Sequence, residues 1–306
     1  MKILGHERIL ELLLSLKAQS FLFTGPEGVG RRAVARWYAW QLNGEHYAND
    51  YLEIAPETET KGGKKARKPQ ILLEQIAPRE AGGENLLDWL STHPRHRAKV
   101  AVIDGAHLLN EPAGNALLKI LEEPPAYARI ILIAPSRELV LPTLASRSLE
   151  IAFGPLPLSI LRQLSTDPEV LAYAEGAVGR VRWALEHPLE FQKLLARTEG
   201  VLESLVGPHS GAAQTQQALK ALGELDHGLG YLARRLEGIF PPESPRRREA
   251  LEALAQTQEA LSAYTGEELA YTWLALRLWR LVNSQSDPAR AGTPYAAKKT
   301  SQAKPL

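Results

Sequence analysis

Short apolar runs that alternate with helix-period segments are the feature that most constrains the fold of this chain. The runs lie at residues 21–23, 51–55, 99–104, 129–134 and 149–153. Strands that are apolar at nearly every position are typical of a parallel sheet with helices on both faces. The alternation therefore predicts an α/β domain built on a parallel sheet.

The segment GPEGVGRR, residues 25–32, lies between the first strand and a helix expected over residues 28–42. Its position and glycine spacing match a P-loop, G-x-x-x-x-G-K-[ST]. In that motif backbone N–H groups cradle phosphates, the Lys contacts the β/γ-phosphates and the hydroxyl holds Mg²⁺. Gly25 and Gly30 are correctly spaced, but Arg31 replaces the Lys and Arg32 replaces the Ser/Thr.

The strand over residues 99–104 ends in Asp104, where a P-loop ATPase places an Mg²⁺-binding Asp. In many such enzymes a Glu follows as the base, whereas Gly105 follows here. Arg32 would repel Mg²⁺, although Arg31 could still pair with a phosphate. We therefore predict a degenerate P-loop without intrinsic ATPase activity or bound ATP, with Asp104 as a relic ligand or a loop anchor. An anion held without hydrolysis and an active nucleotide site remain alternatives.

Composition excludes several other classes of chemistry. The absence of Cys excludes disulfides, a thiol nucleophile and a Cys-ligated zinc site, and the eight His show no metal-like spacing. A net charge of +1 gives no global field for nucleic acid. No apolar run approaches the length of a membrane span and no signal peptide is evident, so we expect a cytoplasmic protein.

The length of 306 residues suggests more than one domain. We assign a P-loop domain to residues 1–153, a small helical unit to 154–188, and a mostly helical region to 189–285. Within that region, residues 252–281 read as two helices joined near Gly266. Residues 286–306 have few apolar side chains and are expected to be disordered. The basic segment KGGKKARK, residues 61–68, is expected to be a disordered loop.

Several segments together resemble the clamp-loader subunits of bacterial DNA polymerase III, members of the AAA+ class. They are Gly5-His6-Glu7, FLFTGPEGVG, KVAVIDGAHLLNEPAGNALLKILEEPP and Ser146-Arg147-Ser148. NALLKILEEPP is the most specific of these matches. The resemblance covers residues 1–153 well, the small helical unit weakly, and the rest only as a helical collar of suitable size. It implies an AAA+-type P-loop domain, a helical lid domain and a collar domain for oligomerisation.

Within that family the degenerate loop and Gly105 favour the non-hydrolysing delta-prime subunit. Ala134 and Pro135 point the same way, because motor subunits resemble one another in having threonines there. The runner-up is an ATP-hydrolysing motor subunit or other AAA+ ATPase, and a small-molecule P-loop kinase is a third reading. The family's four-cysteine zinc module is absent, which leaves the fold of residues 43–83 open.

The element Ser146-Arg147-Ser148 resembles the family's Ser-Arg-Cys motif, which places its Arg against the ATP of the neighbouring subunit. Arg147, with Ser146 beside it, is therefore the candidate arginine finger acting in trans. Such an Arg is worth roughly 10³ to 10⁵ in rate in GTPases. The implied partners are gamma/tau-type motor and delta subunits, and primed DNA through the assembled complex. Contact with the sliding clamp remains open, and no membrane partner is implied.

Other positions have a functional and a plain structural reading side by side. Lys119 could reach a DNA phosphate or be an ordinary surface Lys. Gly179, Arg180 and Arg182 lie near the family's sensor arginine or are solvated helix residues. The basic segment 61–68 and residues 246–248 are DNA contacts or solvated surface. Packing in the core or between subunits is the expected role of three aromatic residues: Tyr271, Trp273 and Trp279.

Overall fold

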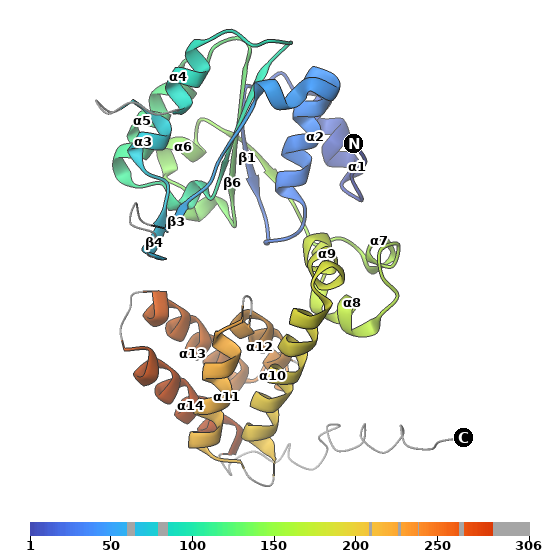
Figure 1. The fold of residues 1–306 in the computed structure, drawn as a ribbon, viewed down its shortest axis with the longest axis vertical. Coiled ribbons are helices and arrows are strands. Elements are labelled where there is room, and N and C mark those ends of the chain that lie inside the picture. Colours follow the sequence, from blue (N-terminus) through green and yellow to red (C-terminus); the bar gives the residue numbers. More distant parts are fainter. Residues whose placement is uncertain are drawn as a thin grey trace. The chain divides into compact units, whose positions relative to one another are not determined.

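A computed structural model of the chain describes residues 1–59, 65–78, 85–207, 210–225, 228–237, 239–262 and 266–283. It contains two compact units that divide between Pro188 and Leu189 (Figure 1). The first unit is built on a sheet with strand order β2-β5-β6-β1-β7, and neighbouring strands run parallel throughout. The five strands are β1 (Ser20–Thr24), β2 (Tyr51–Ile54), β5 (Lys99–Asp104), β6 (Ala128–Ala134) and β7 (Leu149–Ala152). The predicted parallel α/β sheet is therefore confirmed.

Helices cover both faces of this sheet (Figure 1). On one side lie α1 (Glu7–Ser15) and α2 (Arg31–Asn43). On the other lie α3 (Leu73–Ile76), α4 (Leu86–Ser91), α5 (Glu111–Glu122) and α6 (Pro142–Ala145). Successive strand residues point to opposite faces, so Phe21 and Phe23 join the α1/α2 core while Leu22 joins the α5 core. Each strand thus needs apolar residues at successive positions.

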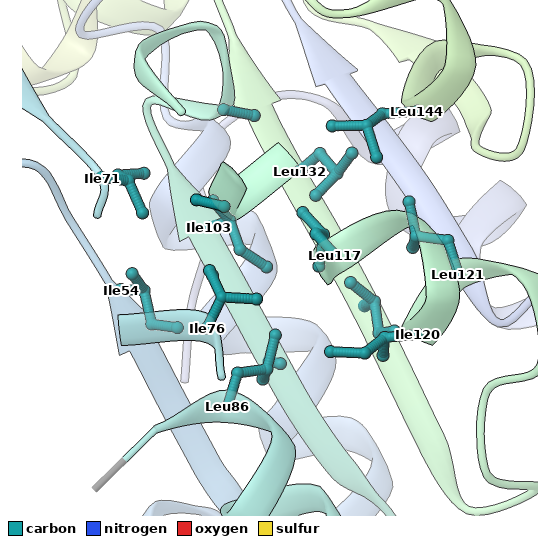
Figure 2. Close-up of a cluster of buried hydrophobic side chains, with 14 of the residues drawn as sticks. Ile54, Ile71, Ile76, Leu86, Ile103, Leu117, Ile120, Leu121, Leu132 and Leu144 are labelled. Atoms are coloured by element: carbon teal, nitrogen blue, oxygen red, sulfur yellow. The ribbon is translucent and has the colours of Figure 1, made fainter. Parts of the chain in front are cut away.

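Helix α5 contributes much of the second core. Leu117, Ile120 and Leu121 are buried, and Figure 2 shows Leu117 beside Ile103 of β5 and Leu132 of β6. Asn110 caps the start of α5, because its side chain accepts a 2.9 Å hydrogen bond from the backbone N–H of Ala113. The specific motif NALLKILEEPP is therefore largely a packing motif.

Two local predictions need correction. Helix α2 begins at Arg31 and not at residue 28, because Gly28 and Gly30 have φ values of 81° and 110°, outside the helical region. Residues 65–68 belong to strand β4 (Lys65–Gln70), which pairs antiparallel with β3 (Glu57–Glu59), so the expected loop is wrong there. The backbone of this basic segment is hydrogen-bonded to β3, a pairing that its composition does not predict. Residues 61–64 lie outside the described residues.

The segment that follows α2 is held by two buried polar side chains. It forms a 3₁₀ helix, η1 (Gly44–Asp50). Asn43 donates to the carbonyl of Ala98 at 2.8 Å and accepts from the N–H groups of Arg97 and Ala98, both at 3.1 Å. Asp50, 1% exposed, accepts from the backbone N–H groups of Arg95 and His96 at 2.8 Å and from His96 Nδ1 at 3.0 Å. These bonds tie the segment to the start of β5.

We expect Asp50→Asn to lower the free energy of unfolding by about 1–3 kcal/mol, since it weakens a set of buried hydrogen bonds. Burial alone would raise the pKa of Asp50, but hydrogen bonds from Arg95 and His96 outweigh it and lower the pKa below its ordinary value. A lowered pKa stabilises the fold above the unfolded-state value and ceases to do so as pH falls through the folded value.

The stability difference between wild type and Asp50→Asn should therefore be complete at pH 6 and should shrink below about pH 4. Denaturant unfolding at a series of pH values measures it. Glu45→Gln is the matched control, because Glu45 lies exposed in the same segment. A difference that stays constant down to pH 2, or an equal effect of the control, would contradict this role for Asp50.

The first unit also contains the small helical region predicted for residues 154–188. Its helices are α7 (Leu158–Leu161), α8 (Pro168–Ala174) and α9 (Val178–Glu186). Val170 and Tyr173 of α8 and Val181 of α9 are buried. Two short 3₁₀ helices, η2 (Ala106–Leu108) and η3 (Arg137–Leu139), complete this unit's described elements.

The described part of the second unit is helical. Its helices are α10 (Pro188–Val206), α11 (Ala212–Gly223), α12 (Gly228–Glu237), α13 (Pro245–Ser262) and α14 (Glu267–Asn283). The expected pair of helices joined near Gly266 is confirmed by α13 and α14. Tyr271 is buried, whereas Trp273 is exposed. The tail at residues 286–306, predicted to be disordered, lies outside the described residues. Among the residues that are described, no helix is both long and apolar enough to span a bilayer.

Candidate functional site

The glycine loop between β1 and α2 is fixed from both flanks. The N–H of Gly25 donates to the carbonyl of Pro135 at 3.0 Å. A side chain at Gly25 would collide with the carbonyl of Phe153, and its φ of 136° disfavours other residues. His6 Nε2 donates to the carbonyl of Val29 at 2.8 Å, and its ring packs edge-on against Phe153. These contacts fix the conformation of the loop at both of its ends.

Arg31 turns back into its own domain. One guanidinium N–H donates to the carbonyl of Ala134, at the end of β6. Burial lowers the pKa of Arg31, and the carboxylates of Asp104 and Glu27 oppose that shift. The group remains charged, since an Arg is not deprotonated in proteins. Arg31 occupies the position of the phosphate-binding Lys. Its hydrogen bond to the carbonyl of Ala134 uses an N–H group that would otherwise be available to a phosphate.

Arg32 lies between two carboxylates. Its Nη1 is 3.2 Å from Asp104 Oδ2 and its Nε is 3.2 Å from Glu53 Oε1. Arg36, one helical turn further along α2, pairs with the same Glu53 at 2.8 Å, and Tyr51 donates to Glu53 at 2.8 Å. The charge of Asp104 is thus balanced by the guanidinium of Arg32. In a working P-loop the position of Arg32 is a Ser or Thr, whose hydroxyl holds Mg²⁺.

The backbone after Asp104 does not favour the missing base. Gly105 has a φ of 93°, a left-handed conformation that a Glu would adopt only with strain. A Cβ at this position would also lie 3.0 Å from Cγ of Pro56. Replacing Gly105 with Glu would therefore not restore a catalytic base by itself, because the backbone at this position also disfavours a Glu.

Helix α9 packs directly on the loop. The N–H of Gly179 donates to the carbonyl of Gly28 at 2.8 Å, and a Cβ on Gly28 would lie 3.2 Å from Cβ of Ala177. Arg180, a candidate for the sensor arginine, pairs with Glu175 at 3.5 Å. Arg182 is exposed. The small helical region therefore contacts the loop through backbone and small residues.

Arg147 lies in the short connection between α6 and β7. Its Nη2 is 2.8 Å from Glu122 Oε1, and its Nη1 donates to the carbonyl of Thr143 at 3.1 Å. Ser146 donates from Oγ to the same carbonyl at 3.0 Å, and the side chain of Ser148 is buried. Arg147 is 37% exposed. Its guanidinium is accessible from outside this chain.

Arg147 and the P-loop lie at opposite edges of the sheet. β1 and β7 are parallel, and Phe21 pairs with Leu149. Arg147 therefore precedes β7 at the amino edge, whereas the loop follows β1 at the carboxyl edge. The five residues of β1 span roughly 15 Å. The predicted loop residues Gly25, Gly30, Arg31, Arg32 and Asp104 come together, and Ser146 and Arg147 lie apart from them.

Three residues at these sites were missed by the sequence analysis. Glu53 could have been noticed as a carboxylate inside a short strand. Glu122 lies in the most specific motif, yet nothing in the sequence indicates its pairing with Arg147. His6 was quoted only as part of a resemblance. Lys119, the candidate DNA contact, is exposed on α5. Among the described residues no cluster of three or more His, Asp or Glu side chains could hold a metal.

A solved structure shares the fold of this chain. A DNA polymerase III gamma subunit-related protein from Thermotoga maritima superposes with a TM-score of 0.56 at 18% identity, covering 90% of this chain and 99% of that one. At this identity the match speaks to the fold alone. The shared fold comprises the parallel sheet with its glycine loop, the small helical region and the helices of the second unit.

Sequence comparisons show similarity to one group of proteins. Residues 15–157 match the model described as "DNA polymerase III, delta subunit". The tau subunit of Salmonella typhimurium is 30% identical over 96% of this chain and 45% of its own length. The delta' subunit of Pseudomonas aeruginosa is 31% identical over 46% of this chain and 44% of its own length. The chain is therefore similar to the clamp-loader subunits of bacterial DNA polymerase III. It spans less than half the length of these two relatives.

Proposed function

We propose that this chain is a non-hydrolysing, delta-prime-like subunit of the DNA polymerase III clamp loader. It acts as a stator that lends Arg147 to the ATP site of a neighbouring subunit while the sliding clamp is loaded onto primed DNA. The observation that carries the proposal is the guanidinium of Arg32 bound to Asp104 and Glu53, in the place of a magnesium-binding hydroxyl. A subunit with this arrangement does not switch with nucleotide.

The residues of the loop support a site without turnover. Coordination of Mg²⁺ by Asp104 would require Arg32 to leave, since a cation and a guanidinium compete for the same carboxylate. Arg31 would have to leave the carbonyl of Ala134 to reach a phosphate. Even then Gly105 supplies no base. Neither ATP nor a metal ion is therefore part of the proposed function of this chain.

The position of Arg147 supports action in trans. It lies at the edge of the sheet opposite the loop of its own chain, so its guanidinium cannot reach a nucleotide bound there. Leu149, two residues further along the chain, is 43% exposed. Exposed apolar side chains near a functional residue fit a surface that another subunit covers.

The alternative function is that of an ATP-hydrolysing motor subunit in which Arg31 replaces the Lys. Two of the relatives are tau or tau/gamma subunits. The comparisons do not distinguish a motor subunit from a delta-prime subunit. The contacts of Arg31, Arg32 and Gly105 favour the stator. ATP hydrolysis by the isolated chain would favour the motor.

The proposed partners are gamma/tau-type motor subunits and a delta subunit, with primed DNA reached through the assembly. The helices of the second unit would form the collar that joins the subunits, and the location would be the cytoplasm. Co-purification of this chain with motor and delta subunits tests the assembly. The proposal expects a stable complex in which adding this chain raises ATP turnover. Failure to bind either partner would contradict it.

A further inference from the structure

Arg147 is already paired within its own chain. Its guanidinium contacts the carboxylate of Glu122 at 2.8 Å, the carbonyl of Thr143 at 3.1 Å and, at 3.5 Å, Oγ of Ser146. Glu122 is the last residue of α5, and Thr143 belongs to α6. The pair therefore links the end of one helix to the connection that leads into β7. Both side chains are partly exposed, Arg147 at 37% and Glu122 at 45%, so another molecule can reach them.

Glu122 stands where its charge is locally unfavourable. The carboxyl end of a helix carries a partial negative charge and favours cations. Residues 122 and 123 are both Glu, and Pro124 and Pro125 follow directly. The ion pair with Arg147 offsets this cost at residue 122. The position of Glu122 at the helix end therefore gives no reason for a negative charge there. The ion pair with Arg147 does give one.

A carboxylate and a phosphate compete for one guanidinium. Arg binds either group through the same fork of N–H donors. When the guanidinium binds a phosphate, a carboxylate still at hydrogen-bond distance from it would lie close to that phosphate and repel it. Arg147 can therefore bind Glu122 or the phosphate of a neighbouring nucleotide, and each bond weakens the other.

We propose that Glu122 is a positioning residue that holds Arg147 in a resting state and competes with the neighbouring subunit's ATP for it. This inference rests on the proposed role of Arg147 in trans. The pair sets how tightly the neighbouring site binds ATP, because the ion pair must break before the finger engages. Once ATP saturates that site, Arg147 is engaged and Glu122 no longer affects the rate.

The test uses the reconstituted loader with Glu122→Gln, which keeps the size of the side chain and removes its charge. We expect the KM for ATP to fall roughly two- to fivefold, the range that an exposed ion pair supports, with kcat unchanged. The decrease should shrink as salt is added. Glu123→Gln is the matched control, because it removes an exposed charge one residue away, and it should leave the KM unchanged.

The double variant Glu122→Gln with Arg147→Ala separates the two levels of the proposal. It should behave as Arg147→Ala alone, since Glu122 acts only through Arg147. An unchanged or higher KM in Glu122→Gln, or an equal decrease in Glu123→Gln, would overturn the resting pair while leaving the finger intact. So would a decrease that persists without Arg147. Unchanged turnover in Arg147→Ala would instead overturn the proposed function itself.

Discussion

In the reconstituted loader, we expect Arg147→Ala to lower ATP hydrolysis at the neighbouring site by roughly 10³-fold or more, by analogy with arginine fingers of GTPases. The guanidinium would stabilise charge that develops on the transferred phosphoryl group, and Ala offers nothing in its place. Total turnover of a loader with several sites should fall by the share of this site. Steady-state and single-turnover ATPase assays measure both quantities.

Arg147→Ala should leave the isolated chain folded, because the residue is partly exposed and contributes only an exposed ion pair and an exposed hydrogen bond to stability. Arg137→Ala is the matched control. Arg137 lies on the same unit, is 41% exposed and pairs with Glu150 at 3.6 Å. It should leave turnover unchanged. Normal hydrolysis by a correctly assembled Arg147→Ala loader would show that the neighbouring site does not use this residue.

Leu117→Ala should destabilise the first unit by about 3 kcal/mol, within the range of roughly 2–5 kcal/mol for buried Leu to Ala changes. Leu117 is fully buried between α5 and the strands β5 and β6 (Figure 2). The change removes apolar contacts and leaves a cavity that a close-packed core fills only in part. Hydrogen exchange of the β5 and β6 amides under denaturant reports the stability of this unit.

Lys119→Ala provides the comparison on the same helix. Lys119 is exposed, so the free energy of unfolding should change by no more than about 0.5 kcal/mol. Equal effects of the two substitutions would contradict the view that the NALLKILEE motif is mainly a packing element. The same comparison separates stability from any contact of Lys119 with DNA, which would appear only in DNA-binding assays of the loader.

The sheet was predictable because its strands are buried on both faces. Phe21, Leu22 and Phe23 each enter one of two cores, so the sequence is apolar without interruption. Helix α5 was predictable because Asn110 and Pro124 mark its ends. The glycine loop was predictable in place, but not the start of α2, since the left-handed backbone of Gly28 and Gly30 delays the helix.

The polar contacts could not be read from the sequence. Arg32 meets Glu53 and Asp104 only because α2 packs on a sheet in which β2 neighbours β5. The anchoring of the segment after α2 depends on Asp50 meeting backbone N–H groups 45 and 46 residues away. Such contacts follow from the topology of the sheet and leave no local periodicity. The substitution of Arg31 and Arg32 was visible, whereas their partners were not.

We expect the loop of this chain to bind neither Mg²⁺ nor ATP. Calorimetric titration of the purified full chain with ATP and Mg²⁺ tests it most directly. With Arg32 bound to Asp104 and Arg31 bound to Ala134, we predict no heat of binding up to millimolar nucleotide and no phosphate release. Binding at micromolar concentration that depends on Mg²⁺, accompanied by hydrolysis, would contradict the account and identify the chain as a motor subunit.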